Sequence, residues 1–234
     1  MNTPASSRTL ILQRIREASR NAAPSAYPDL LRAYTHAGLL PAEDRIRLMA
    51  ERLREYDADV VECAPAHLPA AIAAKLSASG RRRFVAPPGL PADWLTEGFD
   101  WLTDHALSIA DIESCEGVVT AASAGVADSG TIVLHHTASE GRRILSLLPD
   151  WHLCVLHASQ VVETLPEYFS RCTQPPTLVT WISGPSATAD IEMTRIKGVH
   201  GPRFLHIVLV RDDDSDSSPA KPEQSLKVGP NDSR

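Results

Sequence analysis

From residue 59 to residue 211 the chain alternates short apolar runs with helical stretches, and this alternation restricts its fold more than any other feature. The runs are rich in β-branched residues and bounded by Pro and Gly, which is typical of strands. The first two runs are residues 59–63 and 83–86. Further strands are predicted at 131–135, 153–157, 177–182 and 204–210. Helices are predicted at 161–171 and 187–197. Strands that alternate with helices indicate an α/β fold with a largely parallel sheet flanked by helices.

Two amphipathic segments precede this domain, at residues 8–20 and 43–56, and each places apolar residues on one helical face. We therefore predict a helical N-terminal region of residues 1–57 packed on an α/β domain of residues 58–211. The start is arginine-rich and has no acidic residue before Glu17, which leaves a targeting segment as the alternative.

The last segment, residues 212–234, has six acidic residues against three basic ones and almost no large apolar side chains. Such a segment buries too little apolar surface to offset the entropy lost on ordering. We predict a disordered acidic tail, and an interaction tail of a regulatory or scaffold protein is the alternative.

The charge of the chain argues against nucleic-acid binding. The net charge is −6, half of it lies in the tail, and the basic clusters at 81–83 and 142–143 are short. Without a basic stripe there is no electrostatic reason to expect a nucleic-acid partner. No apolar run approaches the roughly 18 to 20 residues that cross a bilayer, so no membrane span is expected.

The four cysteines are scattered, at positions 63, 115, 154 and 172, and no two of them form a C-x-x-C pair. Reduced thiols in a cytoplasmic protein are the plain interpretation. Iron–sulphur clusters need closely grouped thiolates, so this chain is not expected to hold one. The histidines show no H-x-x-x-H spacing, and no metal site is predicted.

A first group of candidate ligand-binding residues lies in VADSGTIVL, residues 126–134, where a small polar turn leads into a strand. A glycine in such a turn permits close approach of a ligand to the backbone. The candidates are Ser129, Gly130 and Thr131. The alternative is a tight turn in which Asp128 and Ser129 bond their own backbone.

A second candidate is the arginine pair that begins the stretch from Arg142 to Pro149. A guanidinium group can clamp a carboxylate or a phosphate with its fork of donors. Arginines at such a position also serve as a solvated helix start or pair with nearby acids. The sequence does not distinguish which arginine points inward, and Arg142 is taken as the candidate.

The richest candidate segment is SGPSATADIEMTRIKGVHGP, residues 183–202, which joins two predicted strands. A strand followed by glycine, hydroxyls and a helix start exposes N–H groups that favour an anion. Its ligand-binding candidates are Ser183, Gly184, Ser186 and Thr188. Because the carboxyl ends of parallel strands share one edge, Ser183 is expected there. Residues 128–130 could reach that edge only if their strand were antiparallel or their loop folded over.

The same segment contains three candidate catalytic residues, Asp190, Glu192 and His200. None of them is needed for the geometry of a helix start or a glycine-ended helix stop. The alternatives are carboxylates that complement the helix dipole and a histidine that lies in a surface turn.

Four stretches taken together resemble the lactate-utilisation protein C family (LutC, also called YkgG), whose shared module is the LUD domain. They are ADSGTIVL, GRRILSLLPDWHLCVL, ISGPSATADIE and GVHGPRFLHIVLV, and they follow the family's order and spacing. The most specific part is SGPS-x-TADIE followed by GVHGP. Two residues depart from the family pattern: Trp151 replaces a smaller residue, and Ala187 replaces a common Arg, which removes one possible anion contact.

The resemblance implies a fold similar to the NagB/RpiA/CoA-transferase group and a role in oxidising L-lactate to pyruvate. In the family, LutA-like and LutB-like partner subunits carry the iron–sulphur clusters. This chain would then be a non-cluster subunit or accessory protein and, if it is an enzyme, a component of an L-lactate oxidoreductase complex. The alternative is a stand-alone enzyme or binding protein for a small phosphorylated or acyl ligand.

Overall fold

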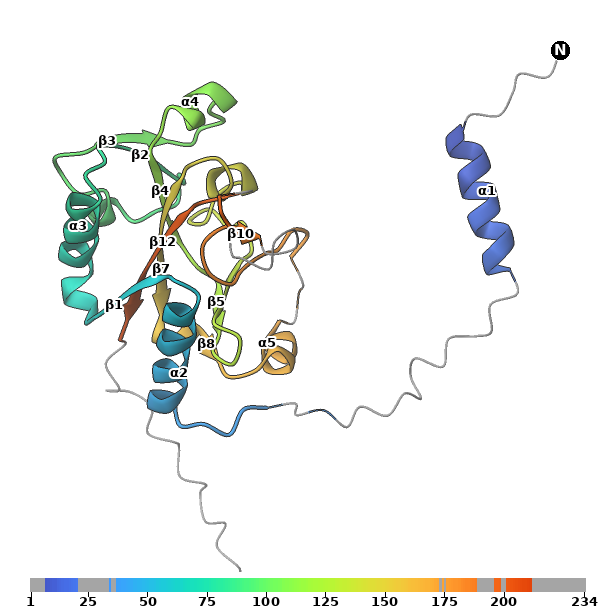
Figure 1. Ribbon diagram of the computed structural model, residues 1–234, viewed down its shortest axis with the longest axis horizontal. Coiled ribbons are helices and arrows are strands. Elements are labelled where there is room, and N and C mark those ends of the chain that lie inside the picture. The colour runs from blue at the N-terminus through green and yellow to red at the C-terminus, as the bar shows by residue number, and fades with distance from the viewer. Residues whose placement is uncertain are drawn as a thin grey trace, which may run out of the picture. The chain divides into compact units, whose positions relative to one another are not determined.

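A sheet of six parallel strands is the centre of the computed structural model (Figure 1). In chain order the strands are β1 (Asp59–Cys63), β2 (Arg83–Ala86), β3 (Asp100–Thr103), β4 (Gly117–Ala121), β7 (Trp151–His157) and β12 (Phe204–Val210). Side by side they run β1-β12-β7-β4-β2-β3, and every neighbouring pair is parallel. This confirms the predicted α/β fold with a largely parallel sheet.

The structure describes residues 7–20, 34, 37–172, 174, 176–188, 196–198 and 201–211. It divides into two units, Met1–Thr35 and His36–Arg234, and the sheet belongs to the second. The first contains α1 (Ser7–Ser19), a helix with no buried residue. The packing of residues 1–57 as one region on the domain stays a prediction, and the acidic tail lies outside the described residues.

Strand β12 is buried on both faces of the sheet. Leu205, Ile207 and Leu209 belong to an apolar cluster with α2 (Ala42–Glu55), while Val208 and Val210 pack in a second cluster with α3 (Leu68–Ala78). Successive side chains of a strand point to opposite faces. A strand covered on both faces therefore needs a nearly continuous apolar run, which residues 204–210 supply.

Four shorter strands form a second sheet. They are β5 (Ala124–Val126), β6 (Thr131–Leu134), β8 (Val161–Val162) and β9 (Thr180–Ile182), in the order β8-β5-β6-β9. Strand β6 runs antiparallel to β5, because the short turn between them reverses the chain. It also runs antiparallel to β9. The sequence places the strand at 177–182 in the parallel sheet, and this placement is wrong.

The second sheet covers part of the first. Ile132 and Leu134 of β6 belong to the same apolar cluster as α2 and β12. Val133, on the opposite face of β6, packs with Tyr168 of α5 (Leu165–Arg171). The two faces of β6 are thus covered by different elements, as the alternation of its side chains requires.

The predicted helix at 161–171 is wrong at its start. The side chain of Thr164 accepts the backbone N–H of Glu167, and a proline occupies the first turn, so α5 begins at Leu165. Val161 and Val162 precede this start and pair with β5 instead.

The predicted helix at 187–197 is wrong at both ends, where β10 (Ala187–Thr188) and β11 (Ile196–Lys197) pair antiparallel. The backbone N–H of Gly198 donates to the carbonyl of Ser186 at 3.0 Å, so these backbone groups are used between segments rather than along a helix. Residues 189–195 lie outside the described residues.

Short elements complete the described fold: α4 (Ile109–Glu113) and the 3-10 turns η2 (Pro65–His67), η3 (Ala92–Trp94), η4 (Arg143–Ser146) and η5 (Ala158–Gln160). None of the helices in the described ranges is long and apolar enough to span a membrane.

The attachment of α2 to the sheets predicts a stability effect. Leu53 of α2 is fully buried, so Leu53→Ala should lower the free energy of unfolding by about 2 to 5 kcal/mol in urea titrations. Leu39→Ala is the matched control because Leu39 is 91% exposed, and it should change stability by less than about 0.5 kcal/mol. Equal stability of the two variants would show that α2 is not part of the core.

Candidate functional site

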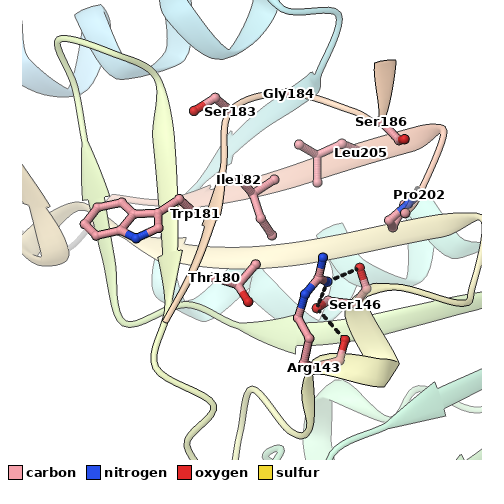
Figure 2. A pocket seen from close by; sticks show the side chains of 11 residues that line it. Arg143, Ser146, Thr180, Trp181, Ile182, Ser183, Gly184, Ser186, Pro202 and Leu205 are labelled. Atoms are coloured by element: carbon pink, nitrogen blue, oxygen red, sulfur yellow. Dashed lines mark hydrogen bonds between the residues drawn. The ribbon is translucent and has the colours of Figure 1, made fainter. Parts of the chain in front are cut away.

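A cavity of about 140 Å³ lies between η4, the chain around β9 and the start of β12 (Figure 2). A single water needs only about 10 to 15 Å³, so the cavity has room for a small molecule. Its lining is rich in hydroxyls and glycines: Arg143, Ser146, Thr180, Trp181, Ile182, Ser183, Gly184, Ser186, Gly201, Pro202 and Leu205.

Arg143 is the charged residue of this lining. Its Nη1 donates to the carbonyl of Ser146 at 3.0 Å and to the Oγ of Ser146 at 2.9 Å (Figure 2). Burial lowers the pKa of Arg143, because a half-buried cation loses hydration, yet the guanidinium stays charged. In the described ranges Arg143 has no acidic partner within ion-pair distance. The described lining of the cavity therefore carries one positive charge, on Arg143.

A chain of three hydroxyls joins the two predicted segments. The Oγ of Ser129 lies 2.8 Å from the Oγ1 of Thr131, which lies 2.7 Å from the Oγ of Ser183. The antiparallel pairing of β6 with β9 produces this contact, since Ile132 faces Ile182 and the next residues then meet. The condition that the strand after residues 128–130 be antiparallel is thus met. Ser183 lines the cavity, whereas Thr131 and Ser129 are connected to it through the Ser183 hydroxyl.

The edge predicted for Ser183 is wrong. Ser183 follows a strand of the second sheet, and its cavity is closed by Leu205 near the start of β12. It therefore does not lie at the carboxyl edge of the parallel sheet. Ser186 and Gly184 line the same cavity, and their binding of a ligand stays a prediction.

Gly130 has a packing role that needs no ligand. Its φ is +59°, and a Cβ built on it would lie 2.7 Å from the Cβ of Arg52 in α2. A side chain there would push the β5–β6 turn away from α2.

Arg142 and Arg143 have different partners. Arg142 Nε donates to Oδ2 of Asp104 at 2.8 Å, and its Nη2 donates to Oδ1 at 2.7 Å. The Asp104 side chain is only 2% exposed, and the hydrogen bond from Arg142 lowers its pKa. Arg142 thus holds the chain that follows β3 in place. Arg143, its neighbour, lines the cavity, and nothing in the sequence separates the two roles.

The remaining candidates are not placed. Asp190, Glu192 and His200 lie outside the described residues, as does the side chain of Thr188. Within the part of the chain that is described, no three His, Cys, Asp or Glu side chains converge as a metal ion would require.

The profile of the LUD domain matches residues 93–210, half of the chain. The chain is also 38% identical over 187 residues to Lactate utilization protein C of Deinococcus radiodurans, covering 78% of this chain and 87% of the relative. The chain belongs to the LUD domain family. This confirms the resemblance seen in the sequence.

Other family members match over shorter regions. The YkgG protein of Escherichia coli is 36% identical over 46% of this chain, and Lactate utilization protein C of Bacillus subtilis is 31% identical over 53%. The chain spans about half the length of each of these two, 49% and 55%. A crystal structure of a DUF162 family protein from D. radiodurans superimposes with a TM-score of 0.64 at 35% identity, over 74% of this chain and 99% of that chain.

The protein interior beside the 140 Å³ cavity contains a neutral polar pair. His152 is fully buried, and its Nε2 lies 2.8 Å from the Oγ1 of Thr120. Burial, together with the nearby Arg143 charge, lowers the pKa of His152 to about 4. His152 is therefore neutral at neutral pH and adds no charge next to Arg143. The sequence shows it only as a polar residue in an apolar run.

The loop at 135–142 supports the cavity from the side of β9. His136 has Nδ1 at 2.8 Å from the carbonyl of Gly141 and Nε2 at 2.8 Å from the Oγ1 of Thr180. A carbonyl can only accept, so Nδ1 donates, and in the neutral form Nε2 accepts from Thr180. Buried Glu140 accepts the backbone N–H of His135 at 2.7 Å and of Thr137 at 3.1 Å. These bonds fix the loop that leads to Arg143.

His152 predicts a pH-dependent stability. An unfolded imidazole takes up a proton near pH 6.5, whereas folded His152 does so only near 4, so the unfolded state binds more protons between these values. The free energy of unfolding should therefore fall as the pH drops from about 6.5 towards 4, by up to roughly 1.4 kcal/mol per pH unit. Urea titrations of His152→Gln should give a shallower slope. The exposed-residue control His105→Gln keeps the buried imidazole and should retain the wild-type slope; a slope lost there too would contradict this assignment.

Proposed function

We propose that this protein is a non-cluster subunit or accessory protein of an iron–sulphur system that oxidises L-lactate to pyruvate. The observation that carries this proposal is the similarity to Lactate utilization protein C of D. radiodurans, which extends over 87% of that relative. In the reaction L-lactate loses two electrons and two protons. We assign the electrons to clusters on LutA-like and LutB-like partner subunits.

The thiols of this chain support that division of labour. Cys154 is fully buried, and burial raises its pKa to about 12. Burial also raises the pKa of Cys115. A thiolate is the form that binds iron, so neither group is prepared to act as a cluster ligand.

The Arg143 cavity supports a role towards lactate or pyruvate. Both molecules carry one carboxylate, a hydroxyl or keto oxygen next to it, and a methyl group. The guanidinium of Arg143 suits the carboxylate, and the hydroxyls of Ser183 and Ser186 suit the second oxygen. Leu205 and Ile182 offer apolar surface to the methyl group. The cavity is small enough for such an acid to contact both kinds of wall.

Arg143→Gln is the direct test of this cavity. L-lactate or pyruvate should raise the melting temperature of the wild-type protein, because a ligand that binds only the folded state stabilises it. At 100 times the dissociation constant the stabilisation is about 2.7 kcal/mol, and Arg143→Gln should remove most of it. Arg47→Gln is the control, since Arg47 is 72% exposed on α2 and should leave the shift unchanged. A full shift in Arg143→Gln would exclude the cavity as the acid site.

The role in the system is tested in cells. Deleting the gene should abolish growth on L-lactate and leave growth on succinate intact, and the tagged protein should co-purify with the cluster-bearing subunits. The wild-type gene should restore growth, whereas the Arg143→Gln gene should restore it poorly. Normal growth of the deletion strain on L-lactate would overturn the proposal.

The alternative is a stand-alone protein for a phosphorylated or acyl ligand. A guanidinium in a cavity that is also lined by three serines suits a phosphate group, and this observation favours the alternative. The same melting-temperature assay with sugar phosphates and acyl-CoA separates the two. A shift with these ligands and none with lactate or pyruvate would favour the alternative.

A further inference from the structure

A second and larger cavity, of about 460 Å³, shares Arg143 with the first. We call it the switch groove. It is lined by Pro88, Asp104, Ala106, His136, Thr137, Ala138, Gly141, Arg142, Arg143 and Leu178. Pro88 follows β2, while Asp104 and Ala106 follow β3. The switch groove therefore lies at the carboxyl ends of parallel strands, the edge that the small cavity does not occupy.

The topology of the sheet opens a crevice at this edge. Strand β2 lies between β3 and β4; the chain leaves β2 towards β3 and later leaves β4 towards β7 on the opposite side. Where the connections from two neighbouring strands leave in opposite directions, ligands of open α/β sheets bind outside the carboxyl ends of the strands. The loop at 135–142 forms one wall, anchored by Gly89 N–H to the carbonyl of Ala138 at 2.9 Å and Ala121 N–H to that of Ser139 at 3.1 Å.

The walls of the switch groove are held in fixed conformations. His136 and Ala106 have φ of +58° and +64°, a region that side-chain-bearing residues rarely adopt. Both ring nitrogens of His136 are hydrogen-bonded, and Asp104 accepts the backbone N–H of Leu107 at 3.0 Å. The rims on both sides are thus tied to the body of the domain.

Among the described residues, the charges of the switch groove leave one positive group, Arg143, without an acidic partner. Asp104 is neutralised by the two hydrogen bonds from Arg142, so that pair contributes little net charge. Arg143 has no such carboxylate among the described residues. Pro88, Ala106, Ala138 and Leu178 give the rest of the wall an apolar character. One cation beside an apolar wall suits an anion with a sizeable apolar body.

We propose that the switch groove binds an organic anion that carries an apolar body, with its anionic group at Arg143 and its body against Leu178, Ala138 and Pro88. A three-carbon acid fits the small cavity and would leave most of the larger groove empty. The groove is therefore a separate binding site, and it does not depend on a role in lactate oxidation.

Anilinonaphthalene sulphonate is a suitable probe, because it is an amphipathic anion whose fluorescence rises in apolar surroundings. It should bind the wild-type protein with saturation, and octanoate should displace it. Leu178→Glu should raise its dissociation constant at least tenfold, since the apolar body would have to pack against a charged carboxylate. Leu178 is 51% exposed, so the variant should fold.

Leu165→Glu is the matched control. Leu165 is 44% exposed on α5, the helix that also carries the exposed Phe169, and it does not line the switch groove. Its dissociation constant for the probe should stay within twofold of wild type. Equal binding by wild type and Leu178→Glu, a loss confined to Leu165→Glu, or absence of saturable binding to wild type would each overturn the proposal.

The melting-temperature shift with lactate separates this inference from the proposed function. Leu178→Glu should retain that shift while losing the probe. Leu178→Glu could lose the probe while the wild-type protein shows no melting-temperature shift with lactate or pyruvate. That result would contradict only the binding of a small acid in the first cavity.

Discussion

The antiparallel pairing of β6 with β9 is the contact on which the candidate site depends. It sets Thr131 beside Ser183 and carries Thr180 to His136, so that the wall of the small cavity is tied to the loop at 135–142. The pairing is stable because β6 has different cover on its two faces, with Ile132 and Leu134 towards α2 and Val133 towards Tyr168. A shift of one residue in register would exchange these faces, so the burial of β6 also fixes which hydroxyls meet.

Two adjacent arginines then divide the electrostatics of the site. Arg142 meets a buried carboxylate and becomes part of the scaffold, since removing Arg142 would leave the buried Asp104 charge without compensation. Among the described residues the Arg143 side chain donates hydrogen bonds to Ser146, and it lines both cavities. His152 nearby adds no second positive charge at neutral pH, because burial disfavours its protonated form.

Much of the architecture could be predicted because it follows from local pattern. The short runs at 59–63, 83–86 and 204–210 form strands of the parallel sheet, and the last is nearly continuous because β12 is covered on both faces. Pattern alone did not reveal that 131–134 and 180–182 pair antiparallel in a separate sheet, because the runs look alike and the pairing partner is distant. Helical spacing was misleading at both ends of residues 187–197, where β10 and β11 pair instead. The choice between Arg142 and Arg143 depended on the position of Asp104, 38 residues away.

The sharing of Arg143 by two cavities gives the two proposals a common physical consequence. One guanidinium group can give its full fork of donors to only one anionic group at a time. An acid in the small cavity would therefore weaken an anion in the switch groove, and thermodynamic linkage requires the reverse effect to have the same size. The position of Arg143, between a cavity at the start of β12 and a groove at the carboxyl ends of β2 and β3, thus makes this one side chain the point at which the two sites are coupled.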